Sequence, residues 1–419
     1  MNLTKPDKIC CSYFNSFKNS GERMELSMSE IPYQHLNPPQ RILLGPGPSN
    51  VHPRVQMAML APIVGHLDLY FITIMEDVVN LLRGLFQTKN KLAFPISGTG
   101  SAGMEASFCN FLEPGDVAVI GVNGLFGERM VDIAQRCGAK VVQVTAEWGR
   151  IVEPEAIENA LKAQRQVKLL ALVHAETSTG VLQPLTEASR LAKQYEALFL
   201  VDTVTSLGGH EVAVDDWGID ICYSGTQKCI SSPPGLAPFT ANEKALATME
   251  TRARKVQSWY LDLSLLSTYW SASRFYHHTA PISMIYALHE ALALIVEEGL
   301  DTRIRRHLRH GAALQAGLEA MGLILHAQKG HRLSSLTSVR IPDGVDDLRV
   351  RQSLLSQFGI EIGGGLGRLK GKIWRIGLMG YSSSAENVLL VLFALEKLLS
   401  AEGYQVQPGI GVKSAIQAL

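Results

Sequence analysis

The 419-residue sequence predicts an α/β fold, with a mostly parallel sheet in a large domain and a smaller C-terminal α+β domain. Three observations predict it: apolar runs of strand length recur from about residue 90, helical patterns separate several of them, and the connections are short. Strand–helix–strand alternation of this kind is typical of a parallel sheet covered on both faces. Such sheets bind ligands outside the carboxyl ends of their strands, so functional residues are expected there.

The predicted elements of the large domain alternate between about residues 90 and 224. Apolar runs of strand length lie at 92–96, 117–122, 140–144, 169–174, 198–201 and 219–224. Helical patterns lie at 101–112, 127–137, 154–163 and 186–195. This order predicts successive βαβ units.

A long helical region over 280–320 precedes the smaller domain. Strands near 336–341 and 373–376 and helices at 346–358 and 385–399 follow it. Strands grouped with helices in this order predict a separate α+β domain, with a boundary near residue 300. The expected division is an N-terminal arm or tail (1–40), a large domain (41–300), a small domain (301–400) and a C-terminal tail (401–419).

The composition argues against several classes of function. Lys plus Arg and Asp plus Glu each number 39, so the formal net charge is zero, which gives no footprint for nucleic acid or an anionic membrane. No apolar run approaches the roughly 18 residues of a membrane span. The six cysteines form no CxxC metal pair, and no secretory signal is apparent. We therefore expect a soluble cytoplasmic protein without a metal site, a nucleic-acid partner or a membrane partner.

The first strand runs into SGTGS, residues 97–101, followed by a helix. Glycines let the backbone approach a ligand closely, and the free amides of a helix N-terminus favour an anion such as phosphate. An ordinary capped turn would give the same pattern. Gly98, Gly100 and Gly103 also match a dinucleotide-binding fingerprint, which requires an acidic residue at the end of the next strand. That strand ends in GVNG, without a carboxylate, so an NAD-dependent oxidoreductase is disfavoured.

Two charged residues follow later strands at the same predicted edge. The strand 198–201 leads to Asp202, and the strand 219–224 leads through GTQK to Lys228. A buried aspartate needs a partner, and the protonated nitrogen of a pyridine ring would supply one, although a helix-cap or loop carboxylate would give the same pattern. A lysine beside a phosphate loop and a carboxylate favours a Schiff base, for which burial and positive neighbours would lower the lysine pKa. Together, loop, aspartate and lysine predict a pyridoxal-phosphate (PLP) site.

With these residues the chain resembles the class V aminotransferases of PLP fold type I, and is most similar to alanine–glyoxylate and serine–pyruvate aminotransferases. The resemblance extends from about residue 40 onward. The matching stretches are LLGPGPSN (43–50), ISGTGS (96–101), VNGLFGERM (122–130), HAETSTGVLQPL (174–185), VDTVTSLGG (201–209), YSGTQK (223–228), PPG (233–235), RFYHHTAP (274–281), IEIGGGLG (360–367) and WRIGLMG (374–380).

The resemblance implies a role for each matching residue. Lys228 would form the Schiff base and act as general base and acid, and Asp202 would pair with the pyridinium nitrogen. The remaining roles would be phosphate contacts from Gly100, Ser101 and Gln227, ring packing by Val204 and Phe126, a bond to the ring hydroxyl from Thr177, phosphate contacts across a homodimer from Tyr276 and Thr279, and substrate binding by Arg375 and Gly47. Phe126 stands where similar proteins carry tryptophan, and phenylalanine can still stack, with less area.

The activity that the resemblance implies is transfer of an amino group from alanine or serine to glyoxylate or pyruvate. Phosphoserine aminotransferase and a non-catalytic PLP-binding protein stay open as alternatives. A cysteine desulfurase needs a nucleophilic cysteine in its C-terminal part, and no cysteine follows Cys229. The pairing of Lys228 and Asp202 with Arg375 favours catalysis over binding alone.

Overall fold

The computed structural model describes residues 33–271 and 273–419. Residues 41–419 form one compact unit, and residues 33–40 carry no helix or strand and belong to a separate unit. Most of the predicted N-terminal arm, residues 1–32, lies outside the described residues. The division into two domains at residue 300 stays a prediction.

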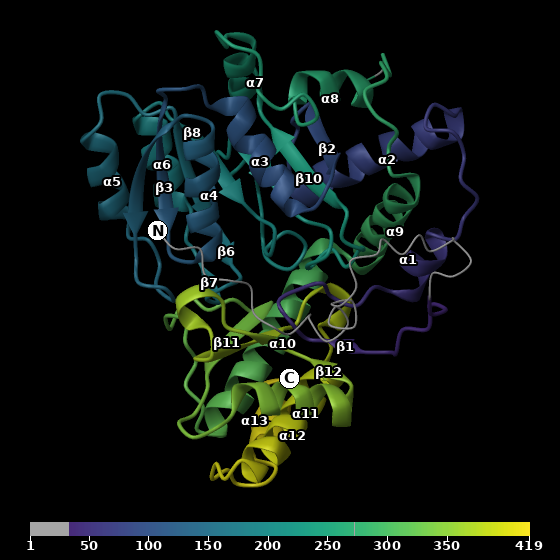
Figure 1. Cartoon of the computed structure of the whole chain (residues 1–419), viewed down its shortest axis with the longest axis vertical. Helices are drawn as coiled ribbons and strands as arrows, with labels where there is room; N and C mark the ends of the chain where they lie inside the picture. Colours follow the sequence, from purple (N-terminus) through teal and green to yellow (C-terminus); the bar gives the residue numbers. More distant parts are fainter. Residues whose placement is uncertain (1–32, 272) are drawn as a thin grey trace, which may run out of the picture. The chain divides into compact units, whose positions relative to one another are not determined.

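A seven-stranded sheet forms the centre of the unit 41–419 (Figure 1). Its strands, in spatial order, are β2 (Leu92–Ser97), β10 (Leu236–Ala241), β9 (Ile221–Tyr223), β8 (Leu198–Asp202), β5 (Leu169–Val173), β3 (Val117–Val122) and β4 (Lys140–Thr145). All pairings are parallel except those of β10, which is antiparallel to both β2 and β9. The predicted mostly parallel sheet is therefore confirmed.

Strand β10 is the one member of this sheet that the sequence pattern did not predict. It contains Pro238, which lacks the backbone N–H that a central strand normally donates, and prolines argue against a strand in sequence reading. The Pro238 carbonyl still accepts a hydrogen bond from the Ser224 N–H at 2.7 Å. The strand is therefore held in the middle of the sheet although its sequence is unfavourable.

Every residue of the central strands β5 and β8 is buried. Both faces of the sheet are therefore covered, and helices cover them. Helices α3 (Gly100–Phe111) and α4 (Leu125–Arg136) contact one another and the sheet, and so do α5 (Pro154–Lys162) and α6 (Thr186–Gln194). The other helices of this part are α1 (Pro53–Ala58), α2 (Leu69–Phe86), α7 (Glu243–Glu250), α8 (Leu263–Trp270) and α9 (Ile282–Glu298).

The predicted long helical region over 280–320 consists of two helices. Helix α9 ends at Glu298 and α10 (Leu300–Ala320) begins after Gly299, whose φ of 80° favours glycine. The elements that follow are β11 (Leu336–Arg340), α11 (Asp347–Phe358), β12 (Ile360–Glu361), β13 (Gly363–Gly364), η2 (Gly367–Leu369), β14 (Ile373–Gly377), η3 (Gly380–Ser382), α12 (Ala385–Ala401) and α13 (Ile410–Ala418). The predicted C-terminal tail therefore contains a helix, which packs against α10 and α12.

Small sheets accompany the large one. Strands β11, β14 and β13 form a three-stranded antiparallel sheet, and β1 (Ile42–Leu43) pairs in parallel with β12. Strands β6 (Ala175–Glu176) and β7 (Val181–Leu182) form a hairpin directly after β5. One hydrophobic core lies within 55–295, and a second joins Leu44 to residues of 313–415. Residues close to the N-terminal end of the described chain thus complete the C-terminal part.

Candidate active site

Asp202 is the last residue of β8 and is 2% exposed. One carboxylate oxygen accepts a hydrogen bond from the Val204 N–H at 2.8 Å, and the other accepts from the Tyr223 hydroxyl at 2.7 Å. Burial raises the pKa of Asp202 to about 6, while these donors oppose the rise. The end of β8 therefore presents a buried carboxyl group that is satisfied only in part by the protein.

Lys228 follows β9 by five residues and is 8% exposed. Its Nζ donates to the Pro46 carbonyl oxygen. Burial, and then the positive charge of Arg375, lower the pKa of Lys228 to about 8. The charges of Lys228 and Asp202 also act on each other, each favouring the ionised form of its partner. The predicted meeting of a reactive amine with the carboxylate at the strand ends is thus consistent with the structure.

The turn between β2 and α3 lies against the segment between β9 and Lys228. A methyl group on Gly100 would lie 3.0 Å from Val204 Cγ2, and one on Gly225 would lie 3.1 Å from Gln227 Oε1. The oxygen Gln227 Oε1 is buried and has no hydrogen-bond partner among the described residues. Thr99, at the start of α3, provides no side-chain cap for the helix. The uncapped N–H groups of α3 are donors, as an anion site requires, whereas Gln227 Oε1 is an acceptor that needs a hydrogen-bond donor.

Phe126 and Thr177 are held at this edge by hydrogen bonds. The Phe126 N–H donates to Glu176 Oε2 at 3.1 Å, and Thr177 Oγ1 lies 2.9 Å from Thr205 Oγ1. The guanidinium of Arg129 lies 5.0 Å from the centre of the Phe126 ring and donates to Ser101 Oγ at 3.3 Å. Ser101 is exposed, whereas Gly100 is buried and Gln227 is half-buried.

Arg375 lies in the middle of β14 and is 6% exposed. Its Nε donates to the Gly364 carbonyl at 2.8 Å, and its Nη1 donates to the Thr177 carbonyl at 3.3 Å. Burial lowers the pKa of Arg375 to about 10, while the buried Glu176 opposes the change. The predicted substrate arginine thus contacts Thr177, in the hairpin that follows β5.

Glycines remove side chains from the space in front of Lys228. Gly47 has a φ of 104°, and a methyl group there would lie 2.7 Å from Lys228 Cδ. A methyl group on Gly363 would lie 2.5 Å from Pro46 Cδ. The segment 45–48 therefore passes directly over Lys228.

Tyr276 and Thr279 are exposed and are not among the hydrogen-bonding partners of Asp202, Lys228 or Gln227 in the described residues. The Tyr276 ring lies 5.2 Å from that of His66. Their predicted reach to a neighbouring subunit stays a prediction. Residues 33–271 and 273–419 contain no group of three or more His, Cys, Asp or Glu side chains placed to hold a metal ion.

Several residues of this edge were not singled out from the sequence. Pro46, Arg129, Glu176 and Tyr223 contact residues that were, and all four lie inside the matching stretches quoted above. No periodicity or composition distinguishes them, because their roles depend on contacts between distant segments. Glu176 follows the apolar strand β5 by three residues, with His174 and Ala175 between them, so the strand pattern alone does not single it out.

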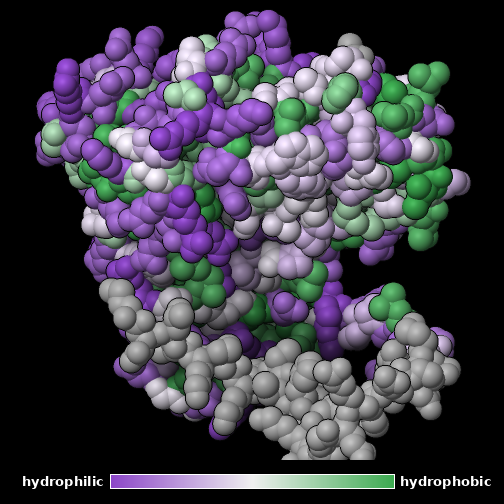
Figure 2. All heavy atoms as spheres, turned by 45° about the horizontal axis from the view of Figure 1, so that its top comes forward, coloured by the Kyte–Doolittle hydropathy of each residue, from purple (hydrophilic) through white to green (hydrophobic). Residues whose placement is uncertain are grey.

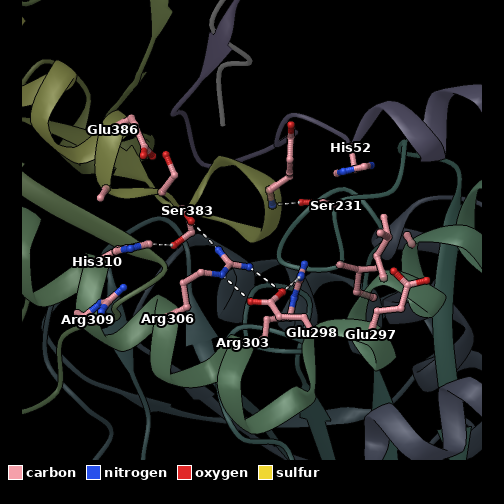
Figure 3. Close-up of a pocket in the computed structure, with 16 residues that line it drawn as sticks. His52, Ser231, Glu297, Glu298, Arg303, Arg306, Arg309, His310, Ser383 and Glu386 are labelled. Atoms are coloured by element: carbon pink, nitrogen blue, oxygen red, sulfur yellow. Dashed lines mark hydrogen bonds and ion pairs between the residues drawn. The ribbon is translucent and has the colours of Figure 1, made fainter. Parts of the chain in front are cut away.

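A separate pocket of about 620 Å³ lies beside the segment that follows Lys228 (Figure 3). Arg303 donates to Glu298 at 2.7 Å and to the Cys229 carbonyl at 2.7 Å. Arg306 also binds Glu298 and donates to the Ser383 carbonyl at 2.5 Å. Figure 3 shows these side chains converging on one another. Arg303, Arg306 and Glu298 are thus paired with one another, as in a structural cluster.

Comparison with known proteins identifies the family. The model of the family "Aminotransferase class-V" matches residues 58–386. The chain belongs to the class-V aminotransferase family. It is 44% identical to an (S)-ureidoglycine–glyoxylate transaminase of Bacillus subtilis, over 90% of this chain and 95% of that protein. It is 42% identical to an alanine–glyoxylate aminotransferase of Callithrix jacchus, over 87% and 89% of the two chains.

A solved structure agrees with this assignment. The crystal structure of an alanine–glyoxylate aminotransferase from Nostoc sp. superposes with a TM-score of 0.87 at 49% identity, and covers 89% of this chain and 98% of that one. The fold is therefore that of PLP fold type I, and the chain is an aminotransferase, as the sequence predicted. No helix of the described residues is long and apolar enough to cross a membrane.

Proposed function

We propose that this aminotransferase uses PLP bound at Lys228 and moves the amino group of a small amino acid to glyoxylate, with pyruvate as a second acceptor. The observation that carries the proposal is the buried amine of Lys228, whose pKa is lowered to about 8, beside the buried carboxyl of Asp202. A lysine used only for structure would stay exposed and charged. A perturbed pair of this kind in a glycine-lined space favours a catalytic centre.

The residues present fit the cofactor. The α3 N-terminus has no side-chain cap, so its N–H groups near Gly100 and Ser101 can donate to a phosphate, and Gln227 would contribute through its amide N–H group, because its buried and unpaired Oε1 only accepts. Lys228 would hold the aldehyde carbon covalently, Asp202 would face the ring nitrogen, and Thr177 the ring hydroxyl. Val204 and Phe126 would pack against the ring. Bound PLP supplies an electron-withdrawing ring that stabilises negative charge on the substrate's α-carbon.

The protein's own groups then have distinct tasks. Arg375 binds the substrate carboxylate, because its planar guanidinium matches the two carboxylate oxygens. Lys228 Nζ would take the proton from the substrate α-carbon and pass it to the carbon of the former aldehyde, and its lowered pKa keeps a share of the amine neutral near pH 7. The Pro46 carbonyl accepts a hydrogen bond from Nζ and can hold the free amine near the reacting atoms. The backbone at Gly47 lies close to Lys228, and the backbone at Gly363 lies close to Pro46. This limits the space beside the amine and favours substrates with small side chains.

We also propose a homodimer in which Tyr276 and Thr279 complete the neighbouring site. Large hydrophobic side chains are exposed along the segment before α2 and in the 275–276 loop, at Met57, Leu60, Ile63, Leu67, Leu69, Tyr70, Phe275 and Tyr276. Figure 2 shows hydrophobic side chains gathered at the right-hand edge of the molecule, the side on which α2 lies in Figure 1. Exposed apolar patches of this kind mark protein interfaces. A cytoplasmic location remains our expectation.

The amino donor is the open part of the reaction. The named relatives share glyoxylate and differ in the donor, alanine in one case and (S)-ureidoglycine in the other. The sequence resemblance favours alanine or serine. The 44% identity to the Bacillus subtilis protein makes (S)-ureidoglycine a second candidate.

A spectrum and a substrate panel test the proposal. The purified protein mixed with PLP is expected to show a visible absorption band that borohydride abolishes. Each of L-alanine, L-serine, (S)-ureidoglycine and L-phosphoserine is then paired with glyoxylate and with pyruvate, and the glycine or alanine formed is measured. We expect L-alanine with glyoxylate to be the fastest pair. A protein that gains no band with PLP and transfers no amino group in any pair would contradict the proposal.

A further inference from the structure

Helix α4 carries Phe126 but lacks a cap of its own. Its N-cap residue is Gly124, which has no side chain to accept the free N–H groups of the first turn. Buried amide groups of this kind need acceptors, because an unpaired buried donor is costly. The acceptors come from the turn after β5, about 50 residues further along the chain.

Two side chains of that turn accept the free amides of α4. Leu125 N–H donates to Ser178 Oγ at 2.9 Å, and Phe126 N–H donates to Glu176 Oε2 at 3.1 Å. The Gly127 backbone also interacts with the Glu176 carboxylate. A carboxylate at a helix N-terminus is further favoured by the helix dipole. The first turn of α4 is thus closed by a distant segment.

Glu176 is itself fixed in place. It is 0% exposed, and its other oxygen, Oε1, accepts from the Ser178 hydroxyl at 2.6 Å and from the Ser178 N–H at 3.0 Å. A methyl group on Gly124 would clash with the carboxyl carbon of Glu176, so the glycine leaves room for the carboxylate. These contacts leave Glu176 little freedom to take another position.

We propose that Glu176 is a positioning residue, which caps α4 and thereby sets the Phe126 ring against the cofactor. The proposal deepens the proposed function and rests on it, because the ring has a partner only when PLP binds. It also explains why a charged residue is kept in a site where it contacts neither Lys228 nor Asp202 by a hydrogen bond. Acting through Phe126, Glu176 would affect cofactor affinity more than the chemical step.

The test compares Glu176→Gln with a matched control. Glutamine has nearly the same shape, but its single amide oxygen can accept from the α4 amides or from the Ser178 N–H, not from both, so one of these donors then faces the glutamine NH2 group. The control is Asp220→Asn, because Asp220 is also buried and accepts from a backbone amide, Phe199 N–H at 2.8 Å. Asp220 directly precedes β9 and pairs with the start of β8, at the opposite end of these strands from Asp202 and Lys228. It therefore reports on the loss of a buried carboxylate away from the site.

Two readouts separate positioning from general stability. Amide hydrogen exchange in a peptide covering residues 123–130, measured without PLP, is expected to rise about tenfold in Glu176→Gln and to stay unchanged in Asp220→Asn. The dissociation constant for PLP, measured by absorbance titration, is expected to rise about tenfold in the first variant only. Glu176→Asp, which keeps the charge on a shorter side chain, should restore part of the affinity.

The outcomes distinguish this inference from the proposed function. If the unsubstituted protein binds no PLP, the proposed function fails and the link from Glu176 to the cofactor fails with it. If the unsubstituted protein binds PLP and Glu176→Gln matches it in both exchange and affinity, the positioning role alone is overturned. Should Glu176→Gln fail to fold, Ser178→Ala gives the same test, since it removes the acceptor of the Leu125 amide and is expected to raise exchange in the same peptide. An unchanged exchange rate in Ser178→Ala would overturn the role as well.

Discussion

Two neighbouring regions of this molecule bury charged side chains and treat them differently. At the strand ends, Lys228 Nζ donates one hydrogen bond among the described residues, to Pro46. The pKa of Lys228 is lowered and that of Asp202 is raised, so both lie closer to 7 than usual. In the pocket beside α10, Arg303 and Arg306 share Glu298 and also bind backbone carbonyls. The two regions meet at one peptide, because Arg303 binds the carbonyl of Cys229, the residue after Lys228.

Under the proposed function, this difference separates the buried charges that would serve chemistry from those that hold the fold together. Paired charges with several hydrogen bonds stay ionised and hold segments together, whereas buried groups with few partners shift their pKa and keep capacity for a ligand. A large pocket is therefore a poor guide here, since Arg303, Arg306 and Glu298 in the pocket of Figure 3 already have partners. Substitutions in the two regions should consequently have opposite signatures, one on turnover and the other on stability.

The largest expected effect is that of Lys228→Ala. Removal of the amine should lower kcat for amino transfer by about 10⁴-fold or more, because both the covalent anchor and the proton-transfer group are lost. The protein should stay folded, since a poorly paired buried amine contributes little to stability. Turnover assays and urea unfolding of the same preparation measure both effects. A variant that keeps its PLP band and its turnover would place the reactive amine elsewhere.

The sequence predicted the strand ends well and their surroundings poorly. Asp202 and Lys228 were found because each follows an apolar strand, and the order of such strands is visible in the sequence. Strand β10 was missed because Pro238 weakens its pattern, and the break at Gly299 was missed because the helical pattern continues through it. Glu176 was missed because its role depends on contacts with Phe126 and Ser178, which no local sequence pattern encodes.

A smaller effect of the opposite kind is expected for Glu298→Gln. The substitution leaves Arg303 and Arg306 facing each other without their shared carboxylate, and Arg303 is 5% exposed. Breaking a buried pair costs roughly 3–5 kcal/mol, and the partial exposure of Glu298 places the expected loss of unfolding free energy at about 3 kcal/mol. Urea unfolding measures the loss. The KM for the amino donor should stay within about twofold of the original, and a larger change would show that the pocket of Figure 3 tunes the site after all.

The smallest expected effect concerns the pH dependence of cofactor uptake, and it tests whether Lys228 at the strand ends has a lowered pKa. Only the neutral amine of Lys228 can attack the PLP aldehyde, so the rate of uptake by the cofactor-free protein should rise with pH and level off above about 8, the lowered pKa of Lys228. An ordinary lysine would continue to gain reactivity up to about pH 10.4. Arg375→Gln removes the second cause of the lowered pKa, so the plateau should begin at a higher pH and uptake at pH 7 should slow severalfold. Burial is the larger cause, so the plateau should still begin below the value of an exposed lysine. Stopped-flow absorbance across pH 6–10 measures both curves, and superimposable profiles would mean that the charge of Arg375 does not reach the amine.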